Sequence, residues 1–395
     1  MSTKESLPPI IGVYIMRCIY SITYYWEKIV PQIKFHRITH DFIVFQCLSV
    51  VFTLKVIDHL KESPKNVKEL AVLTNSSEKN LFRVMRALSS EGFFSFDENS
   101  GKFSINSMST LLTNNQITKE NPTGINSDEE SLSCLFSMIQ YPAFIEAWNS
   151  LKDCVQTGVP GFHIKHGMSF FQYIDEKDTY LKKIFDSAMK QKNFMTKIHT
   201  QISQNYNFSD YSVICDIGGG VGYLGYEIIS RHPKCQIHIL EIEETVKNGL
   251  ELCKGDSKKM LAIENEKMIF KVGDMFQPKT IPRANVYILM QVIHDWNNQD
   301  ALRILSSITA VMRREKAITH QRPKLLIIDY IIEDNFNQDS YKKISISDII
   351  MMAIVGGEER TRSQWNFLFK ETGLSLLSVK KFNRPPFLSL MELTV

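Results

Sequence analysis

The 395-residue sequence lacks any Cys-x-x-Cys pair, and its seven cysteines are scattered along the chain. No Cys/His spacing typical of a zinc site or of a disulfide framework is present. Cys47, Cys215 and Cys235 lie inside apolar runs, where small buried thiols usually remain reduced. The sequence therefore predicts a cytoplasmic chain with no metal site.

An excess of charge of one sign is also lacking. The 46 Lys and Arg residues against 43 Asp and Glu leave a formal net charge of +3. Proteins dedicated to nucleic-acid binding depend on many unpaired cations, so this balance argues against a nucleic-acid partner. No internal repeat or low-complexity tract appears, and 44% hydrophobic with 23% charged residues is a globular composition. The length predicts two or three domains.

One long apolar stretch is present, residues 10–26, and Arg17 stands in its middle. The arrangement of a signal peptide, with positive charge before the apolar region and a small-residue cleavage site after it, is not found there. A central Arg is costly inside a bilayer. We expect a helix packed against protein, and a membrane-surface contact of these residues stays open as the alternative.

The first hundred residues predict helices followed by a hairpin. Apolar spacing indicates helices over residues 40–60, 66–73 and 77–92, and two short alternating segments around a polar turn follow at 93–105. This order is typical of a winged helix. The third helix mixes basic and acidic residues, which favours a solvated face over a DNA-reading one.

The polar residues 113–128 predict a linker, and residues 131–206 return to helical patterns interrupted by a loop at 157–171. From Tyr211 onward, short β-branched runs alternate with helical segments, which indicates βαβ units and a parallel sheet. The final residues read as helix, strand, strand. We therefore expect an N-terminal domain over residues 1–115, a linker and helical cap over 116–205, and an α/β domain over 206–395.

A glycine-rich loop, residues 216–222 (Asp-Ile-Gly-Gly-Gly-Val-Gly), follows the first of these strands and precedes a helix. Residues 220–225 also fit Gly-x-Gly-x-x-Gly, and Glu241 follows the second strand, as in dinucleotide-binding proteins. The alternative is the loop of methyltransferases that use S-adenosylmethionine, with Asp216 ending the strand. The segments 273–276 (GDMF) and 293–296 (IHDW), together with the closing hairpin, favour the methyl donor.

At this point the chain resembles a known family, the small-molecule O-methyltransferases of the caffeate and acetylserotonin type. The resemblance runs from about residue 35 to the C-terminus. The segments that carry it are LFRVMRALSSEGFF, HGMSFFQY, FDSAMK, DIGGGVG, GDMF, HDW and GGEERT. It implies a class I Rossmann-like domain preceded by a winged-helix domain, and a homodimer formed through that N-terminal domain. The resemblance also implies that the substrate which receives the methyl group is a small-molecule acceptor.

The resemblance implies that His294 is the general base that takes a proton from the acceptor hydroxyl. A histidine near its ordinary pKa of ~6.5 can do this at neutral pH. Asp329 and Glu359 match the carboxylates that orient such a base. Asp329 could instead cap a turn, and Glu359 could be a solvated partner of Arg360 or Arg362. Asp295 is expected at the acceptor or as a cap of the next helix.

For the cofactor, the resemblance implies contacts from the glycine loop and from the ends of the next two strands. The residues are Asp216, Gly218, Gly220, Glu241, Asp274 and Met275. Glu241 stands where the family usually has Asp, and both can bind a pair of ribose hydroxyls. Met290 stands where plant members often have Lys, so one polar contact to the donor is missing.

The acceptor site is expected to include Phe185, Met189 and Met351, although Met and Phe at helical spacing also suit an ordinary core. If they line it, the acceptor is flat and largely apolar, an aromatic with a hydroxyl. Lys192 and Ile354 stand near places where plant members have His and Asn, which disfavours the usual plant phenylpropanoids. Two other functions stay open, a DNA-binding regulator with a ligand-sensing methyltransferase-like domain and a catalytically inactive scaffold.

Overall fold

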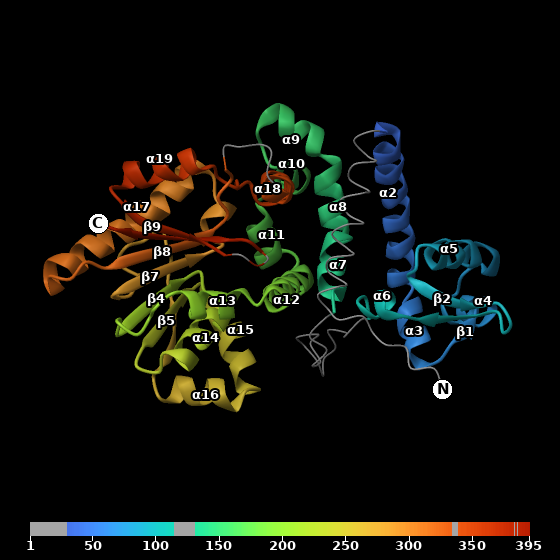
Figure 1. The fold of residues 1–395 in the computed structure, drawn as a ribbon, viewed down its shortest axis with the longest axis horizontal. Coiled ribbons are helices and arrows are strands. Elements are labelled where there is room, and N and C mark those ends of the chain that lie inside the picture. The colour runs from blue at the N-terminus through green and yellow to red at the C-terminus, as the bar shows by residue number, and fades with distance from the viewer. Residues whose placement is uncertain (1–29, 114–130, 334–338, 383, 385) are drawn as a thin grey trace. The chain divides into compact units, whose positions relative to one another are not determined.

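The computed structural model describes residues 30–113, 131–333, 339–382, 384 and 386–395. It divides into two compact units, residues 1–133 and 134–395, which are described separately (Figure 1). The apolar stretch 10–26 and nearly all of the linker 113–128 lie outside the described residues. The domain boundaries expected near residues 115 and 205 stay predictions.

The N-terminal unit joins one long helix and several short ones to a three-stranded antiparallel sheet with the order β1-β3-β2. Its α4 starts at a capping box, in which Asn66 Oδ1 accepts the Glu69 amide and the Glu69 carboxylate accepts the Asn66 amide. The order helix, helix, hairpin expected over residues 66–105 is the observed order. The elements are α2 (Pro31–Thr53), α3 (Val56–Glu62), β1 (Lys65–Asn66), α4 (Val67–Leu73), α5 (Glu78–Ser90), β2 (Phe94–Asp97), β3 (Lys102–Ile105) and α6 (Ser107–Thr110).

The single helix predicted over residues 40–60 is two helices, α2 and α3, that meet at 60°. Lys55 adopts a left-handed conformation (φ 56°), which ends α2 before α3 begins. The prediction was wrong because the apolar pattern continues across the break, with Val56 and Leu60 both buried. In the described part of the chain no single helix is long and apolar enough to cross a bilayer. The bent pair α2 and α3 passes that test together, by length and composition alone.

Short helices fill most of residues 131–206, as the sequence predicts. The loop expected at 157–171 nevertheless contains a helix, α10, so that part of the prediction was wrong. Gly158 and Gly167 are left-handed caps that end α9 and α10, rather than markers of an irregular loop. The helices are α7 (Ser133–Ile139), α8 (Pro142–Asn149), α9 (Leu151–Thr157), α10 (Gly161–His166), α11 (Phe170–Glu176), α12 (Thr179–Thr196) and α13 (Ile198–Asn205).

A seven-stranded sheet with the order β6-β5-β4-β7-β8-β10-β9 forms the centre of the C-terminal unit. β4 to β8 pair in parallel, whereas β10 pairs antiparallel with both β8 and β9. This confirms the predicted parallel sheet with a closing hairpin. The strands are β4 (Val213–Ile217), β5 (Gln236–Glu241), β6 (Met268–Val272), β7 (Val286–Met290), β8 (Lys324–Asp329), β9 (Ser375–Lys381) and β10 (Ser389–Thr394).

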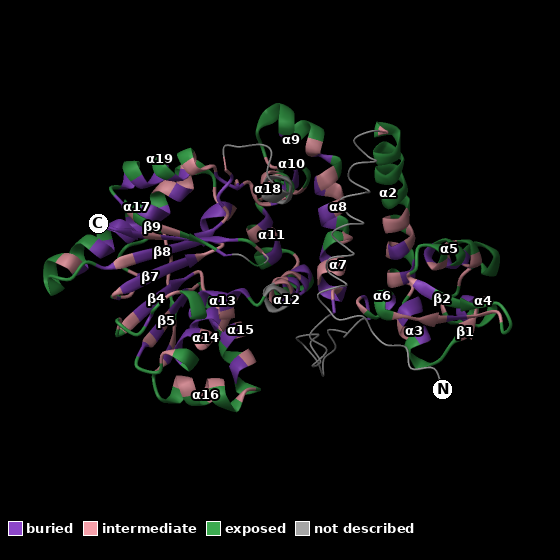
Figure 2. Ribbon diagram, in the orientation of Figure 1, coloured by how far each residue is buried: buried purple, intermediate pink, exposed green. Residues whose placement is uncertain are grey.

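Helices cover both faces of this sheet and bury its strands (Figure 2). α17 and α19 pack on one face through residues such as Leu305 and Trp365, and α13 and α14 pack on the other through Ile202 and Ile228. Each such side chain contributes about 1.5–3 kcal/mol when fully buried. The remaining elements are α14 (Tyr223–Arg231), α15 (Glu243–Lys254), α16 (Ser257–Glu264), the 3₁₀ helix η1 (Ile293–Asp295), α17 (Asn298–Thr319), α18 (Asp339–Ile350), the π-helix η2 (Met351–Val355) and α19 (Arg362–Thr372).

The packed sheet brings chemically active residues to one edge. Parallel strands end at the same side of a sheet, and open α/β sheets bind their ligands there. Asp216 is the penultimate residue of β4, Glu241 ends β5 and Asp329 ends β8. η1, which carries His294, follows β7. The functional site is therefore expected at this edge.

Candidate active site

The glycine loop after β4 is shaped by close backbone approaches. Gly218 has φ 68°, and a Cβ on it would lie 2.8 Å from Val292 Cγ2. A Cβ on Gly219 would lie 2.6 Å from Asp216 Oδ2. Side chains at these two positions would clash with Val292 and Asp216, so only glycines allow the loop to pack this closely.

Two carboxylates face this loop. Glu241 Oε1 accepts the Gly220 amide at 2.9 Å, and its Oε2 accepts the Ile242 amide at 3.1 Å. Asp216 is 1% exposed, and its Oδ2 has no hydrogen-bond partner among the described residues. Burial, with the nearby Glu241 charge, raises the pKa of Asp216 to about 7. A buried acceptor without a partner points to a ligand that donates hydrogen bonds, such as one with an ammonium group and hydroxyls.

Asp274 and Met275 follow β6 at the same edge of the sheet. Asp274 Oδ1 accepts the Phe276 amide at 2.9 Å, and Oδ2 accepts Gln277 Nε2 at 2.9 Å, so the carboxylate stabilises its own turn. Met275 is half-buried against the core around Leu289. In this structure the Asp274 carboxylate makes local contacts, and its predicted contact with an adenine stays a prediction.

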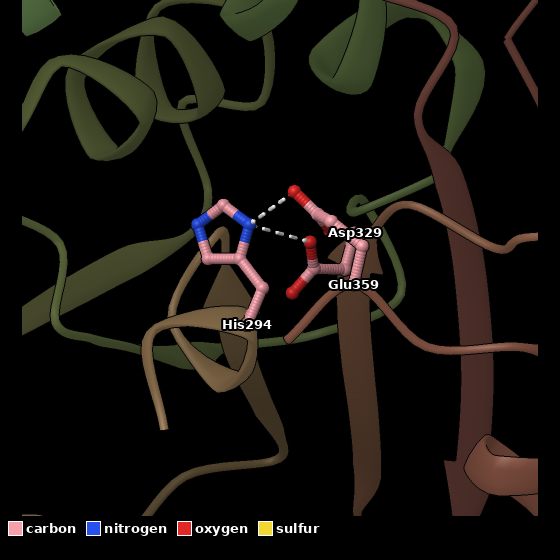
Figure 3. A group of neighbouring side chains, drawn as sticks. All are labelled: His294, Asp329 and Glu359. Atoms are coloured by element: carbon pink, nitrogen blue, oxygen red, sulfur yellow. Dashed lines mark hydrogen bonds and ion pairs between the residues drawn. The ribbon is translucent and has the colours of Figure 1, made fainter. Parts of the chain in front are cut away.

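His294 lies at the centre of a buried cluster with Asp329 and Glu359 (Figure 3). Its Nδ1 is 3.2 Å from Glu359 Oε1 and 3.4 Å from Asp329 Oδ1. The other ring nitrogen, Nε2, is 3.6 Å from Asp295 Oδ1, and the Asp295 side chain is 24% exposed. Two buried carboxylates at Nδ1 hold a proton on that nitrogen, which leaves Nε2 as the nitrogen that can accept one.

The three carboxylates also change the acidity of the histidine. Burial of the ring disfavours its charged form, but Asp329, Asp295 and Glu359 outweigh burial and raise the pKa of His294 well above its ordinary value. From the sequence we expected a histidine near its ordinary pKa. The number of carboxylates that lie next to the ring depends on the tertiary structure and could not be predicted. Burial has the opposite effect on the carboxylic acid and raises the pKa of Asp329. The net effect of the three carboxylates on His294 is to stabilise the imidazolium, so the ring keeps its proton to higher pH than a free histidine does.

The same cluster has a spacing that could hold a metal ion. One ligand atom each from His294, Asp329 and Glu359 lie within 4.8 Å of one another. The sequence shows no metal-ligand spacing because these residues come from three separate segments. The absence of a metal stays a prediction.

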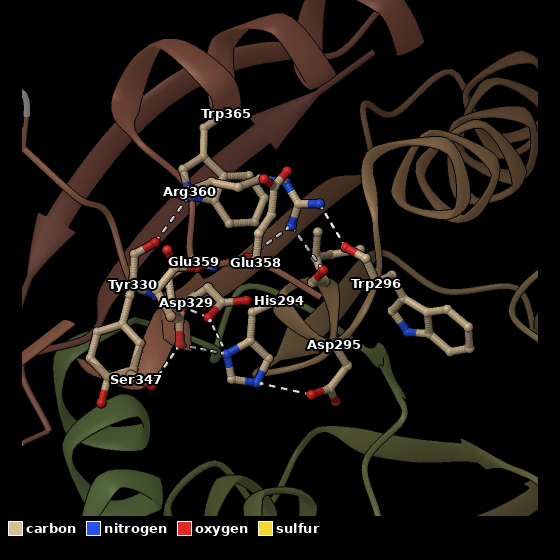
Figure 4. Close-up of polar contacts among 12 residues, drawn as sticks. His294, Asp295, Trp296, Asp329, Tyr330, Ser347, Glu358, Glu359, Arg360 and Trp365 are labelled. Carbon is tan, nitrogen blue, oxygen red and sulfur yellow. Dashed lines mark hydrogen bonds and ion pairs between the residues drawn. The ribbon is translucent and has the colours of Figure 1, made fainter. Parts of the chain in front are cut away.

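Arg360 ties the segment that carries Glu359 to the segment that carries His294 (Figure 4). The guanidinium is fully buried and donates to the Ile293 carbonyl at 3.0 Å and to the Trp296 carbonyl at 2.7 Å. Its ion-pair partner is Glu358, at 3.3 Å. The arginine thus bonds the backbone on both sides of the histidine, which fixes the position of η1.

From the sequence, Arg360 was not predicted to be a positioning residue. It was considered only as an ion-pair partner of Glu359. The structure pairs it with Glu358, whereas Glu359 is buried and faces His294. Ser347 of α18 was also missed, and its hydroxyl donates to Glu359 Oε1 at 2.9 Å. The sequence carries a signal for Arg360 only in the GGEERT segment, and no local pattern singles out Ser347.

The expected acceptor residues lie on two helices of the C-terminal unit. Phe185 and Met189 are half-buried on α12, and Met351 is the first residue of η2. The Phe185 ring packs against Phe170, with centroids 5.1 Å apart. Lys192 lies further along α12, where Glu359, Asp295 and Asp329 act electrostatically on its ammonium group and burial lowers its pKa. Roles of these residues at an acceptor stay predictions.

Comparisons with known proteins match most of the chain. Residues 36–115 match the family model of the O-methyltransferase dimerisation domain, and residues 148–375 match that of the O-methyltransferase domain. O-methyltransferase 10 of Dictyostelium discoideum is 61% identical over 399 residues, which cover 100% of this chain and 91% of that protein. The mitomycin biosynthesis 6-O-methyltransferase of Streptomyces lavendulae is 28% identical, covering 83% of this chain and 85% of that protein.

Solved structures show the same fold. A mitomycin 7-O-methyltransferase superposes with a TM-score of 0.78 at 24% identity, covering 94% of this chain and 99% of the other. Human N-acetylserotonin methyltransferase, solved with S-adenosylmethionine, gives a TM-score of 0.68 at 19% identity, covering 100% and 99%. With the sheet order, the two family models and the Dictyostelium relative in agreement, this chain belongs to the family of class I, S-adenosylmethionine-dependent O-methyltransferases.

Proposed function

We propose that the protein transfers a methyl group to the hydroxyl of a small aromatic molecule, with His294 as general base. The observation that carries this proposal is the contact of His294 Nδ1 with two buried carboxylates, Glu359 at 3.2 Å and Asp329 at 3.4 Å. They orient the ring and stabilise the imidazolium, so that Nε2 can take the proton of the acceptor. The family membership established above fits this chemistry.

The residues around the glycine loop fit S-adenosylmethionine. The buried Asp216 oxygen without a partner suits the donor's ammonium group, and Glu241 retains acceptor capacity for ribose hydroxyls. When bound, the cofactor supplies a methyl group already activated by its sulfonium charge. The protein therefore has to supply a deprotonated nucleophile in the correct place, which is the task we assign to His294.

An aromatic acceptor is supported by the apolar character of the predicted acceptor residues. Phe185, Met189 and Met351 offer flat and polarisable contact surfaces. A structural neighbour from neocarzinostatin biosynthesis was solved with 2-hydroxy-5-methyl naphthoic acid, although it is only 20% identical to this chain. A panel of phenols, hydroxynaphthoates, polyketides and hydroxyindoles is therefore the first set to assay.

We also propose a homodimer formed through the N-terminal unit. Phe35, Ile38 and Phe42 follow one another at helical spacing on α2 and are 67%, 57% and 64% exposed. Such a row of large apolar side chains needs a covering surface. The match of residues 36–115 to a dimerisation domain supports a second copy as that surface.

Binding by calorimetry, combined with turnover, tests the proposal. We expect the protein to bind S-adenosylmethionine and S-adenosylhomocysteine and to be stabilised by about 2.7 kcal/mol at a hundred times the Kd. Glu241→Ala should raise the Kd by at least about 10- to 100-fold, since the loss of even one hydrogen bond to a charged group costs about 1.5–3 kcal/mol. Glu243→Ala is a matched control, because Glu243 is exposed and forms an ion pair with Lys247 on the surface of α15. Stabilisation by NAD or NADP alone would contradict the assignment.

A further inference from the structure

Helix α18 contacts Glu359 at two points, of which Figure 4 shows the one from Ser347. Ser347 Oγ donates to Glu359 Oε1 at 2.9 Å, and Asp348 Oδ1 accepts the Glu359 amide at 2.8 Å. One residue of the helix therefore holds the side chain of Glu359, and the next holds its backbone. Glu359 is 3% exposed, so water does not compete freely for these bonds.

The Glu359 oxygen bound by Ser347 is the oxygen that faces His294. Oε1 lies 3.2 Å from His294 Nδ1, whereas Oε2 has no partner among the described residues. The terminal torsion of a glutamate is broad and has little intrinsic preference. The Ser347 bond thus helps to hold Oε1, rather than Oε2, toward the ring.

We propose that Ser347 is a positioning residue for the base, acting through Glu359. By holding Oε1 toward Nδ1, it keeps the proton on Nδ1 and leaves Nε2 free to accept. Its hydroxyl bonds to Glu359 at the oxygen that faces the ring. This inference rests on the proposed role of His294 as base.

The position of Ser347 also links the base to the predicted acceptor wall. Met351 follows Ser347 by four residues, one helical turn, so the two lie on the same side of α18 as it passes into η2. π-helical turns often occur at functional sites. An acceptor that packs against Met351 would therefore steady the helix that orients Glu359.

The test compares Ser347→Ala with Ser345→Ala. Ser345 is on the same helix two residues earlier, and 100° per residue places it on the opposite side. We expect Ser347→Ala to lower kcat about tenfold, or about 1.4 kcal/mol, with KM values unchanged. Ser347→Thr, which keeps the hydroxyl, should recover most of kcat, and Ser345→Ala should leave it unchanged.

A double-mutant comparison shows whether the effect passes through Glu359. In a Glu359→Gln background, adding Ser347→Ala should cost little more, because the carboxylate it orients is already gone. An equal loss of kcat in both backgrounds would overturn the proposal. So would normal turnover of the folded Ser347→Ala enzyme.

A spectroscopic readout separates this inference from the proposed function. In ¹⁵N-histidine-labelled protein, with the signal assigned by His294→Gln, the His294 Nδ1 proton should be slow to exchange. We expect Ser347→Ala to increase the exchange rate of the His294 Nδ1 proton, and Ser345→Ala to leave that rate unchanged. No change in either variant would overturn the positioning role even if the enzyme is active. A change with no methylation by wild type would support the positioning role and count against the proposed function.

Discussion

Gly357 lies directly against the carbonyl oxygen of His294. A Cβ on Gly357 would stand 1.9 Å from that oxygen and 2.6 Å from the carbonyl carbon of Asp295. The next residue, Glu358, donates its amide to the same His294 oxygen at 2.9 Å. The segment that delivers Glu359 to the ring is therefore docked on the backbone of the base itself.

This contact predicts that Gly357→Ala will inactivate the enzyme. The added methyl must push η1 away by about an ångström, and displacements of that size cost about a hundredfold in rate. We expect kcat to fall by at least about that factor in steady-state assays, with cofactor affinity nearly unchanged. Gly255→Ala is the control, because its Cβ would meet only the Leu252 carbonyl, at 3.9 Å.

Arg360→Lys should destabilise the fold as well as the site. Lysine cannot reproduce the separate bonds to the Ile293 and Trp296 carbonyls, which depend on the planar guanidinium. Breaking such a buried charged contact costs about 3 kcal/mol, so denaturant unfolding should show a loss of that size together with lower turnover. The same change at the half-buried neighbour Arg362 should cost less than about 1 kcal/mol. Equal losses at both positions would contradict the assigned role.

The pH dependence of kcat follows from the raised pKa of His294. Only the neutral ring can accept a proton, so activity should rise with pH, and the midpoint should lie above the ordinary ~6.5. Asp329→Asn removes one of the charges that favour the imidazolium, so it should move the midpoint to lower pH by about one unit or more. The exposed Asp153→Asn change is the control. A midpoint at 6.5 in wild type, or a shift to higher pH in Asp329→Asn, would contradict this account.

Dimerisation through α2 predicts that Phe42→Asp will give a monomer. A charge in the exposed apolar row formed by Phe35, Ile38 and Phe42 cannot be buried without a partner. Light scattering should show loss of the dimer, and turnover should fall with it. Val72→Asp, at a 77% exposed position on α4, should leave the dimer intact. A wild-type protein that is monomeric and fully active at micromolar concentration would rule out the homodimer.

The sheet could be predicted from the sequence because its strands are continuous apolar runs, such as Leu325–Ile328, separated by helical patterns. The break between α2 and α3 at Lys55 could not be predicted. The left-handed conformation of Lys55 has no sequence signal, because the apolar pattern continues on both sides of it. Local periodicity accounts for each strand, and tertiary packing decides such irregularities.

The cluster of His294, Asp329 and Glu359 could be predicted from the sequence only in part. His294 follows β7 and Asp329 ends the neighbouring strand β8, so their proximity is a consequence of the sheet. Glu359 reaches them through long-range contacts, among them the bridge between Ile332 and Thr361, and its expected role came from family resemblance rather than spacing. Ser347 requires the tertiary position of α18, which no sequence period encodes.

The most direct measurement is the single-turnover rate of His294→Gln with its own acceptor, alongside cofactor binding by calorimetry. Glutamine keeps much of the side-chain volume but cannot act as a base. If His294 deprotonates the acceptor, methyl transfer should fall by roughly 10²–10⁴-fold. The Kd for S-adenosylmethionine should stay within about threefold of wild type, since the residues proposed to bind the cofactor lie at or just after the ends of β4, β5 and β6. A variant that methylates at a near-normal rate would contradict the account and would leave proximity to the methyl donor as the source of catalysis.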